Sequence, residues 1–127
     1  MRVSKENHRQ KLGREGEKLA RKYLTRQGYK HIESNYLIGE GEIDLIMREG
    51  RTIVFVEVKT RQSEDFVAGE CLVHYAKQRH MAAAARQFIQ THQLHEYPCR
   101  FDAVIIITPE GQKPVVRHER NIFTPRF

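Results

Sequence analysis

An apolar segment interrupted by charges, VFVEVKTR at residues 54–61, constrains this chain more than any other stretch. Its valines and Phe55 are typical of a buried β-strand. Side chains alternate between the two faces of a strand, so Glu57 and Lys59 share the face of Phe55 and the valines point the other way. Unpaired charge is costly in a buried strand. The segment therefore indicates either an ion pair at a surface or a functional site on a central strand.

The remaining sequence predicts the order helix, three strands, helix, two strands. The predicted elements are a helix over 12–27, strands over 29–36, 42–47 and 52–60, a helix over 73–92, a strand over 100–108 and a short final strand over 115–118. Gly28 is a natural end for the first helix, and Gly50 marks a hairpin turn. A strand that follows a helix favours a parallel neighbour reached by a right-handed crossover. This order predicts a three-layer α/β domain, bordering on α+β, with a mixed sheet of about five strands flanked by helices.

Length and charge limit the remaining possibilities. A chain of 127 residues is most simply one domain over 1–127, in which 1–10 form a basic, flexible arm or the fraying start of a helix. Lys and Arg number 22 against 16 Asp and Glu, a formal charge of +6. This excess favours an anionic partner, with nucleic acid ahead of an acidic membrane surface. Many proteins carry such charge only as solvated surface.

Cysteine usage and hydropathy indicate a cytoplasmic protein. Cys71 and Cys99 are the two cysteines and form no CxxC pair, which fits a reducing compartment. The N-terminal segment has no apolar core of a secretory signal. The longest aliphatic run, 103–107, is far shorter than the roughly 20 residues of a membrane helix. We expect no membrane association.

A second acidic residue accompanies Glu57 in the predicted hairpin. A turn near Glu49 and Gly50 places Asp44 within roughly one ladder step of Glu57. Two adjacent carboxylates repel unless a cation or proton lies between them. Mg²⁺ takes oxygen ligands of this kind together with water and phosphate, and the Val58 carbonyl can add another oxygen. A lone Glu-x-Lys is more often a surface ion pair worth roughly 0–1 kcal/mol.

These parts suit metal-assisted hydrolysis of a phosphodiester. Such a reaction needs a Lewis acid, an activated water and a cationic group. Asp44 and Glu57 would hold the metal ion. Lys59, on the same face as Glu57, would either position the attacking water or stabilise charge on the phosphate.

Several segments together resemble a known nuclease pattern. They are GREGEKLARKYLTRQGY (13–29), GEGEIDLIM (39–47), VFVEVKTR (54–61), AKQRHMAAAARQFI (76–89) and RFDAVIII (100–107). Asp44 followed by Glu57-Val58-Lys59 resembles the PD-(D/E)xK signature of restriction-endonuclease-like nucleases. The whole set resembles the YraN-type (UPF0102) family of predicted endonucleases, which is similar to archaeal Holliday-junction resolvases.

The resemblance implies a fold, an activity and a metal site. It implies a restriction-endonuclease-like domain that hydrolyses DNA, duplex or branched, with Mg²⁺ or Mn²⁺ as cofactor. It makes Asp44, Glu57 and the Val58 carbonyl the metal ligands and Lys59 the catalytic lysine. A glutamate on the first helix completes such sites; Glu17 has that position, and periodicity alone does not separate it from Glu15. The chain departs from the signature at Ile43, which stands where the signature has proline.

Basic residues near these segments are candidate DNA contacts. They are Arg61 by position, Lys77 by resemblance, and Arg79, Arg14 and Lys18 on the two helices. Each could neutralise a phosphate, and each could equally be an ordinary solvated side chain. Asp102 is expected to cap a strand or pair with Arg100.

Histidines and cysteines also invite a zinc interpretation. His92 with His95, and Cys71 with His74, lack a second pair at finger-like spacing. Solvent-facing histidines and a buried thiol are the better interpretation.

Two rival functions stay open. One is a nucleic-acid-binding module of the same fold with little or no hydrolysis. The other is an interaction protein whose acidic pair only stabilises it. Symmetric cleavage of a four-way junction requires two sites related by a two-fold axis, so that version of the nuclease hypothesis predicts a homodimer.

Overall fold

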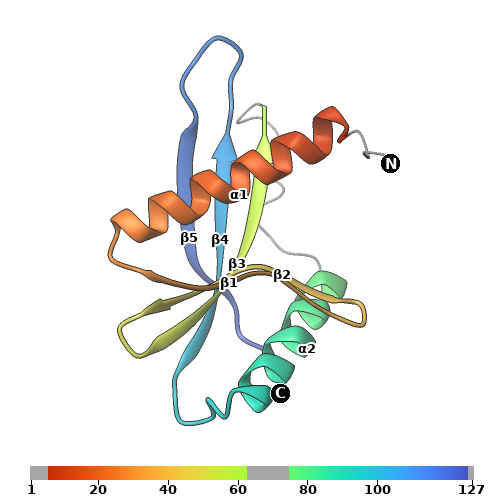
Figure 1. The fold of residues 1–127 in the computed structure, drawn as a ribbon, viewed down its shortest axis with the longest axis vertical. Coiled ribbons are helices and arrows are strands. Elements are labelled where there is room, and N and C mark those ends of the chain that lie inside the picture. Colours follow the sequence, from red (N-terminus) through yellow and green to blue (C-terminus); the bar gives the residue numbers. More distant parts are fainter. Residues whose placement is uncertain (1–5, 63–74, 126–127) are drawn as a thin grey trace, which may run out of the picture.

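The computed structural model describes residues 6–62 and 75–125, which form a mixed five-stranded sheet and two helices (Figure 1). The elements are α1 (His8–Arg26), β1 (Lys30–Ile38), β2 (Gly41–Glu49), β3 (Thr52–Arg61), α2 (Tyr75–Thr91), β4 (Cys99–Ile107) and β5 (Val115–Phe123). The strands lie side by side in sequence order. Only β3 and β4 are parallel among these neighbours, and the other pairs are antiparallel. The predicted α/β fold is confirmed, including the parallel pair that follows a helix.

Each face of the sheet carries one helix and one hydrophobic core. Leu24 of α1 packs with Val54 and Val56 of β3 on one face. Phe88 of α2 packs with Phe55 of β3 on the other. This is the alternation expected of a buried strand, and it gives the three layers helix, sheet, helix. In the part of the chain that the structure describes, no helix is long and apolar enough to cross a membrane.

Helix α1 begins four positions earlier than its apolar stripe predicts. The Asn7 side chain accepts a hydrogen bond from the Gln10 N–H at 2.8 Å, and the Gln10 side chain accepts one from the Asn7 N–H at 3.0 Å. This reciprocal capping satisfies backbone groups that would otherwise lack partners. The helix therefore starts at His8, inside the segment predicted as an arm or a helix start. Its end agrees with the prediction, because Gly28 adopts a φ of 96°.

The last strand is longer than predicted. It runs over Val115–Phe123 and not only to His118. Phe123 pairs with Phe101 of β4, so the apolar end of β5 closes the core beneath α2. An edge strand can carry polar side chains, and the middle of β5 is polar. Because these residues show no apolar alternation, the sequence pattern did not predict that the strand continues through them. Helix α2 spans Tyr75–Thr91, and the predicted start at residues 73–74 lies outside the described residues.

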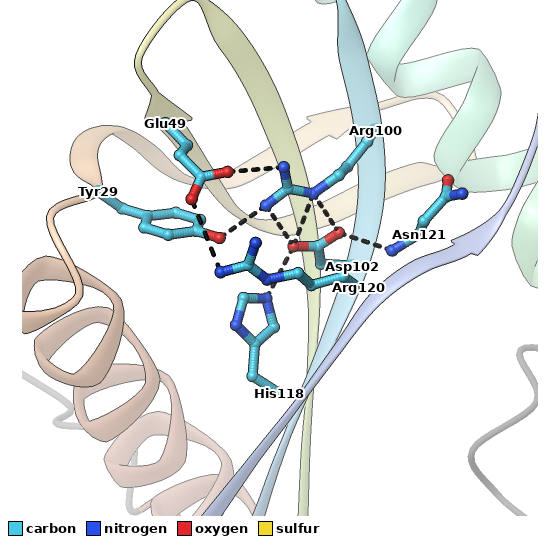
Figure 2. A network of polar contacts seen from close by, with 7 residues as sticks. All are labelled: Tyr29, Glu49, Arg100, Asp102, His118, Arg120 and Asn121. Carbon is cyan, nitrogen blue, oxygen red and sulfur yellow. Dashed lines mark hydrogen bonds and ion pairs between the residues drawn. The ribbon is translucent and has the colours of Figure 1, made fainter.

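Arg100 joins β4 to β2 and to the turn after α1 (Figure 2). Its guanidinium donates to Asp102 at 2.9 Å, to Glu49 at 2.8 Å and to the Tyr29 hydroxyl at 2.6 Å. The predicted pairing of Asp102 with Arg100 is confirmed. An arginine holds three partners here because its planar fork presents several donors at once.

Asp102 lies at the centre of the same network and is completely buried. Its carboxylate accepts the Asn121 N–H at 3.0 Å and lies 2.7 Å from His118 Nε2, in addition to the Arg100 contacts (Figure 2). Burial alone would raise the pKa of Asp102, but the hydrogen bonds from His118, Arg100 and Asn121 outweigh burial and lower it. The carboxylate of Asp102 is fully paired in this network, which indicates that the network stabilises the fold.

Two glycines allow the helices to approach the sheet closely. A Cβ at Gly16 of α1 would collide with the Thr60 side chain of β3. A Cβ at Gly41 of β2 would lie 2.8 Å from the His80 carbonyl oxygen of α2. α1 thus packs closely on the C-terminal part of β3, and α2 packs closely on the start of β2.

We expect Gly16→Ala to destabilise the protein, by about 1–2 kcal/mol, because overpacking costs more than the gain in helix propensity. Gly13→Ala is the matched control in the same helix, where an added Cβ meets nothing within 4 Å. That change should stabilise by up to about 1 kcal/mol. Urea unfolding of both variants measures the difference. Equal effects at the two positions would contradict a close contact between α1 and β3.

We expect Asp102→Asn to lower the free energy of unfolding by about 3 kcal/mol at pH 7. This is at the low end for a broken buried ion pair, because Arg100 keeps its hydrogen bond to Glu49. A carboxyl with a lowered pKa contributes stability above its unfolded pKa of about 4, and this contribution disappears as the pH falls through the folded value. The gap between wild type and variant should therefore narrow below about pH 4. Urea unfolding at neutral and acidic pH tests this, and a gap that stays constant would contradict it.

Candidate active site

The β2–β3 hairpin stops pairing where the two predicted acidic residues stand. Leu45 and Val56 form the last Cα pair at this end, and Asp44 and Glu57 come next in the same register. Asp44 Oδ2 accepts a hydrogen bond from the Val58 N–H at 2.8 Å. Beyond this point the β1–β2 hairpin turns away from β3 (Figure 1). The predicted closeness of the two carboxylates is therefore present, at a fork in the sheet.

Both carboxylates are mostly removed from water. Asp44 is 8% exposed, and the Glu57 side chain is 12% exposed. Burial and the neighbouring Asp44 raise the pKa of Glu57 to about 7, although Lys77 acts in the opposite direction. Burial also raises the pKa of Asp44, against the hydrogen bond from Val58. The surroundings thus disfavour the ionised form of both carboxyl groups.

One oxygen of Glu57 has no hydrogen-bond partner. Lys77 Nζ of α2 lies 3.4 Å from Glu57 Oε2, within ion-pair range. The same oxygen is buried and receives no hydrogen bond. Buried acceptors are nearly always paired, so an orphan of this kind needs an explanation. A divalent cation fits these donors, because hard ions take carboxylate oxygens and leave other positions to water and phosphate.

Helix α1 carries a further carboxylate, Glu17, within electrostatic range of Asp44. Glu17 is half-buried, and burial together with the charge of Asp44 raises its pKa. Glu15 is exposed. Of the two glutamates that periodicity left open, Glu17 is the half-buried one whose pKa the charge of Asp44 raises. Its role remains a prediction.

Glu42 adds a fourth negative charge nearby. It precedes Asp44 by two positions on β2 and raises the pKa of both Asp44 and Glu17. Glu42 is half-buried at the start of the strand. Glu42 therefore adds to the negative charge around Asp44, which Lys77 partly offsets.

Lys59 and Arg61 follow Glu57 along β3. In the parallel ladder Lys59 stands beside Ile105 and Arg61 beside Ile107. Alternation places Lys59 on the face of Glu57, as predicted. Both side chains are half-buried, and Arg61 donates to the Thr60 carbonyl at 2.8 Å.

The other predicted DNA contacts are dispersed. Lys77 faces the site through Glu57 and not the outer surface of α2. Arg79 is exposed, lies 5.7 Å from the Tyr75 ring centroid and lines a groove of about 560 Å³. Arg14 pairs with Glu6 at 2.9 Å. Lys18 is exposed on α1.

The zinc alternatives gain nothing from the structure. His92 and His95 are both exposed. Cys71 and His74 lie outside the described residues. Across residues 6–62 and 75–125, no three His, Cys, Asp or Glu side chains gather as a ligand cluster. The two neighbouring carboxylates Asp44 and Glu57 are thus the core of any metal site in these ranges.

Sequence reasoning missed Asn35 of β1. Its amide acts to lower the pKa of Glu17, against the effect of burial, and its backbone has a positive φ of 52°. The available signal was weak: asparagine is depleted in strands, and this one interrupts a strand-like segment.

In the metal-free protein at pH 8, Glu57→Gln should raise the free energy of unfolding by on the order of 1–3 kcal/mol. The change removes a buried charge and lets an amide donate to Asp44. The pKa of Glu57 is raised to about 7, so ionisation costs stability as the pH rises through that value. Near pH 5, where Glu57 is already neutral, the gain should shrink.

Urea unfolding in EDTA at both pH values measures this effect. Glu96→Gln, at an exposed position, is the charge-matched control. A variant that is less stable than wild type at pH 8 would instead identify Glu57 as one half of a stabilising ion pair with Lys77.

Comparison with known proteins places the chain in a family. The model of "Uncharacterised protein family UPF0102" matches residues 16–106. A UPF0102 protein of Geobacter metallireducens is 43% identical over 116 residues, which is 91% of this chain and 94% of that protein. One from Thermodesulfovibrio yellowstonii is 45% identical over 95 residues, 75% of this chain and 84% of the relative. One from Rhodococcus opacus is 38% identical over 116 residues, 91% and 98% of the two chains. The chain belongs to the UPF0102 family.

Proposed function

We propose that this protein is a metal-dependent nuclease that hydrolyses phosphodiester bonds in DNA. One observation carries the proposal: two buried carboxylates from adjacent strands, Asp44 and Glu57, meet where the strands separate, and a Glu57 oxygen lacks a hydrogen-bond partner. Buried carboxylates with a structural role are normally satisfied, as Asp102 is in this same sheet. Two neighbouring buried carboxylates, one with an oxygen that accepts no hydrogen bond, are typical of a cation-binding site.

The resident ion would be Mg²⁺ or Mn²⁺. Asp44, Glu57 and the Val58 carbonyl would hold it, and Glu17 would complete the acidic side. Such an ion polarises a phosphoryl oxygen and makes a bound water a better nucleophile.

The two lysines would supply positive charge beside the carboxylates. Lys59 lies two positions after Glu57 on the same strand face, so its ammonium can orient the attacking water or offset charge on the phosphate. Lys77 lies on α2 at 3.4 Å from Glu57, so a second ammonium is within reach of a phosphate bound there. The site thus combines acidic residues for a cation with basic residues for an anion.

Basic residues on both helices would bind the DNA backbone. Arg14 and Lys18 lie on α1 on either side of Gly16, which contacts the end of β3. Arg61 lies on that end of β3, and Arg79 lies on α2 two positions after Lys77. Contacts of this kind make affinity fall steeply with salt. They fix no sequence, which suits an enzyme that recognises DNA structure.

Branched DNA is the substrate class we propose, by resemblance to junction resolvases. A four-way junction presents two equivalent strands, so symmetric cutting requires two copies of the site. A homodimer with a two-fold axis would supply them.

Cleavage of a labelled panel tests this function. The panel comprises a four-way junction, a flap, a nicked duplex, plain duplex and single-stranded DNA, each with Mg²⁺, Mn²⁺ or EDTA. Wild type should cut the branched substrates only with metal ion. Glu57→Gln should reduce cutting to background, and Lys59→Met should slow it by about 10²–10³-fold through lost charge stabilisation.

Two helix variants serve as a matched pair in the same assay. Glu17→Gln should lower the rate, whereas Glu15→Gln removes the same charge from the exposed side of α1 and should leave it unchanged. Salt-sensitive DNA binding without metal-dependent cutting would overturn the nuclease proposal and leave a binding module of the same fold.

A further inference from the structure

A groove of about 560 Å³ lies beside α2, apart from the candidate active site. It is lined by α2 and by residues 123–125, where the described chain ends next to this helix (Figure 1). The α2 residues along it recur at helical spacing: Tyr75, Gln78, Arg79, Ala82, Ala83 and Arg86. Lys77, which pairs with Glu57, is two positions from Tyr75 and from Arg79, so it points to another side of the helix. We call this separate surface the α2 groove.

The α2 groove is basic. Arg79 and Arg86 line it, and no Asp or Glu of the described residues does. Neither arginine forms an ion pair with a carboxylate in residues 6–62 and 75–125. Small side chains, Ala82 and Ala83, lie between the two guanidinium groups along the helix and leave room for a ligand. Two arginines in a groove without acidic neighbours favour an anionic ligand.

An exposed aromatic ring stands at one end of the α2 groove. Tyr75 is 73% exposed, the largest fraction among the large hydrophobic side chains that the structure describes. The Arg79 guanidinium carbon lies 5.7 Å from the centroid of this ring. An aromatic ring beside a cation is the combination that binds single-stranded nucleic acid, because a base stacks on the ring while the cation neutralises a phosphate.

A second hollow extends the α2 groove along the helix. It has a volume of about 330 Å³, shares Arg86 with the first and is also lined by Ile89, Gln90 and His95. The helix rises by roughly 22 Å between Tyr75 and Gln90. This length accommodates several nucleotides of an extended strand, as single-strand binding surfaces do.

We propose that the α2 groove binds a single strand of nucleic acid, with phosphates against Arg79 and Arg86 and an unpaired base stacked on Tyr75. The bases of a duplex stack on one another, so a duplex offers no free base face to this ring. The inference goes beyond the proposed nuclease and needs no metal ion, because none of these three residues belongs to the acidic site.

A second copy of this chain fits the α2 groove less well. A two-fold axis places the same surface of both copies in contact. Arg79 and Arg86 would then lie close to their own copies, and no described carboxylate of the groove would neutralise them. Like charges that meet in an interface oppose association. Charge complementarity therefore favours the nucleic-acid strand.

Binding of a fluorescein-labelled oligothymidylate of about 12 nucleotides, a length within the range of single-strand sites, tests the proposal. Fluorescence anisotropy is measured with the whole chain in EDTA at several salt concentrations. Tyr75→Ala should weaken binding by about 5–150-fold, the range for one lost base–aromatic stack, with the salt dependence unchanged. Arg79→Gln and Arg86→Gln should each reduce the slope of log affinity against log salt by about 0.7, because each removes one phosphate contact.

Two variants outside the α2 groove serve as matched controls. Tyr97 is 37% exposed and has Arg51 at 4.8 Å from its ring centroid, but it lines neither hollow. Arg26 is exposed at the end of α1, on the opposite face of the sheet. Tyr97→Ala and Arg26→Gln should therefore bind the oligonucleotide as wild type does. Melting temperatures verify that all variants are folded.

Three results would overturn the proposal. One is wild-type affinity in Tyr75→Ala and in the Arg79→Gln/Arg86→Gln double variant. Another is an equal loss of binding to heparin, a polyanion without bases, in Tyr75→Ala, because the ring would then not stack on a base. The third is a change of association state in the arginine variants by sedimentation with oligonucleotide affinity unchanged, which would assign the groove to a second copy.

The proposed nuclease can fail separately, because the binding assay contains no metal ion. Tyr75-dependent binding without cleavage of any DNA in Mg²⁺ or Mn²⁺ would overturn the nuclease alone. Metal-dependent cleavage together with wild-type oligonucleotide affinity in the groove variants would overturn the α2 groove alone.

Discussion

The hydrogen bond from the Val58 N–H to Asp44 Oδ2 is the interaction on which this site depends. A strand N–H at this place would ordinarily face a backbone carbonyl of the neighbouring strand. A side chain takes that role here, so β2 can leave β3 after Leu45 and Val56 without stranding a buried donor. The fork places two carboxylates inside the sheet, while α1 packs closely on β3 at Gly16 and α2 on β2 at Gly41.

Two buried aspartates in one sheet show how structural and functional acids differ. Asp102 accepts from an arginine, a histidine and a backbone N–H, and these partners lower its pKa. Asp44 has a single backbone hydrogen bond and a second carboxylate as its neighbour, and its pKa is raised. The first arrangement stabilises the folded state unaided. The second costs stability unless a cation or proton joins it, and that cost is the physical sign of a site.

Much of this could be predicted from sequence because it follows from alternation and turn chemistry. The buried strand with Glu57 and Lys59 on one face, the hairpin that brings Asp44 to Glu57, and the parallel strand after α2 are all local or nearly local patterns. The start of α1 was left open between an arm and a helix start, and the predicted length of β5 was wrong. A capping box between polar residues carries no apolar signal, and an edge strand needs few apolar side chains.

The finer features of the site required coordinates. The choice of Glu17 over Glu15 depends on how α1 crosses the sheet, and a helix border offers both. Lys77 was predicted as a DNA contact, and the pairing of its ammonium with Glu57 could not be predicted from the sequence, because it depends on how α2 packs on the sheet. The left-handed backbone of Asn35 leaves no mark in hydrophobic periodicity. These features depend on tertiary packing between elements that are far apart in the chain.

The central claim is that Asp44 and Glu57 form a divalent-cation site. A crystal soaked in Mn²⁺ tests it most directly, through the anomalous difference map. The account predicts one strong peak between the Asp44 and Glu57 carboxylates, with Lys77 displaced from Glu57 Oε2. A map with no peak there, and the Lys77–Glu57 pair intact at saturating Mn²⁺, would show that the acidic pair is structural and would contradict the account.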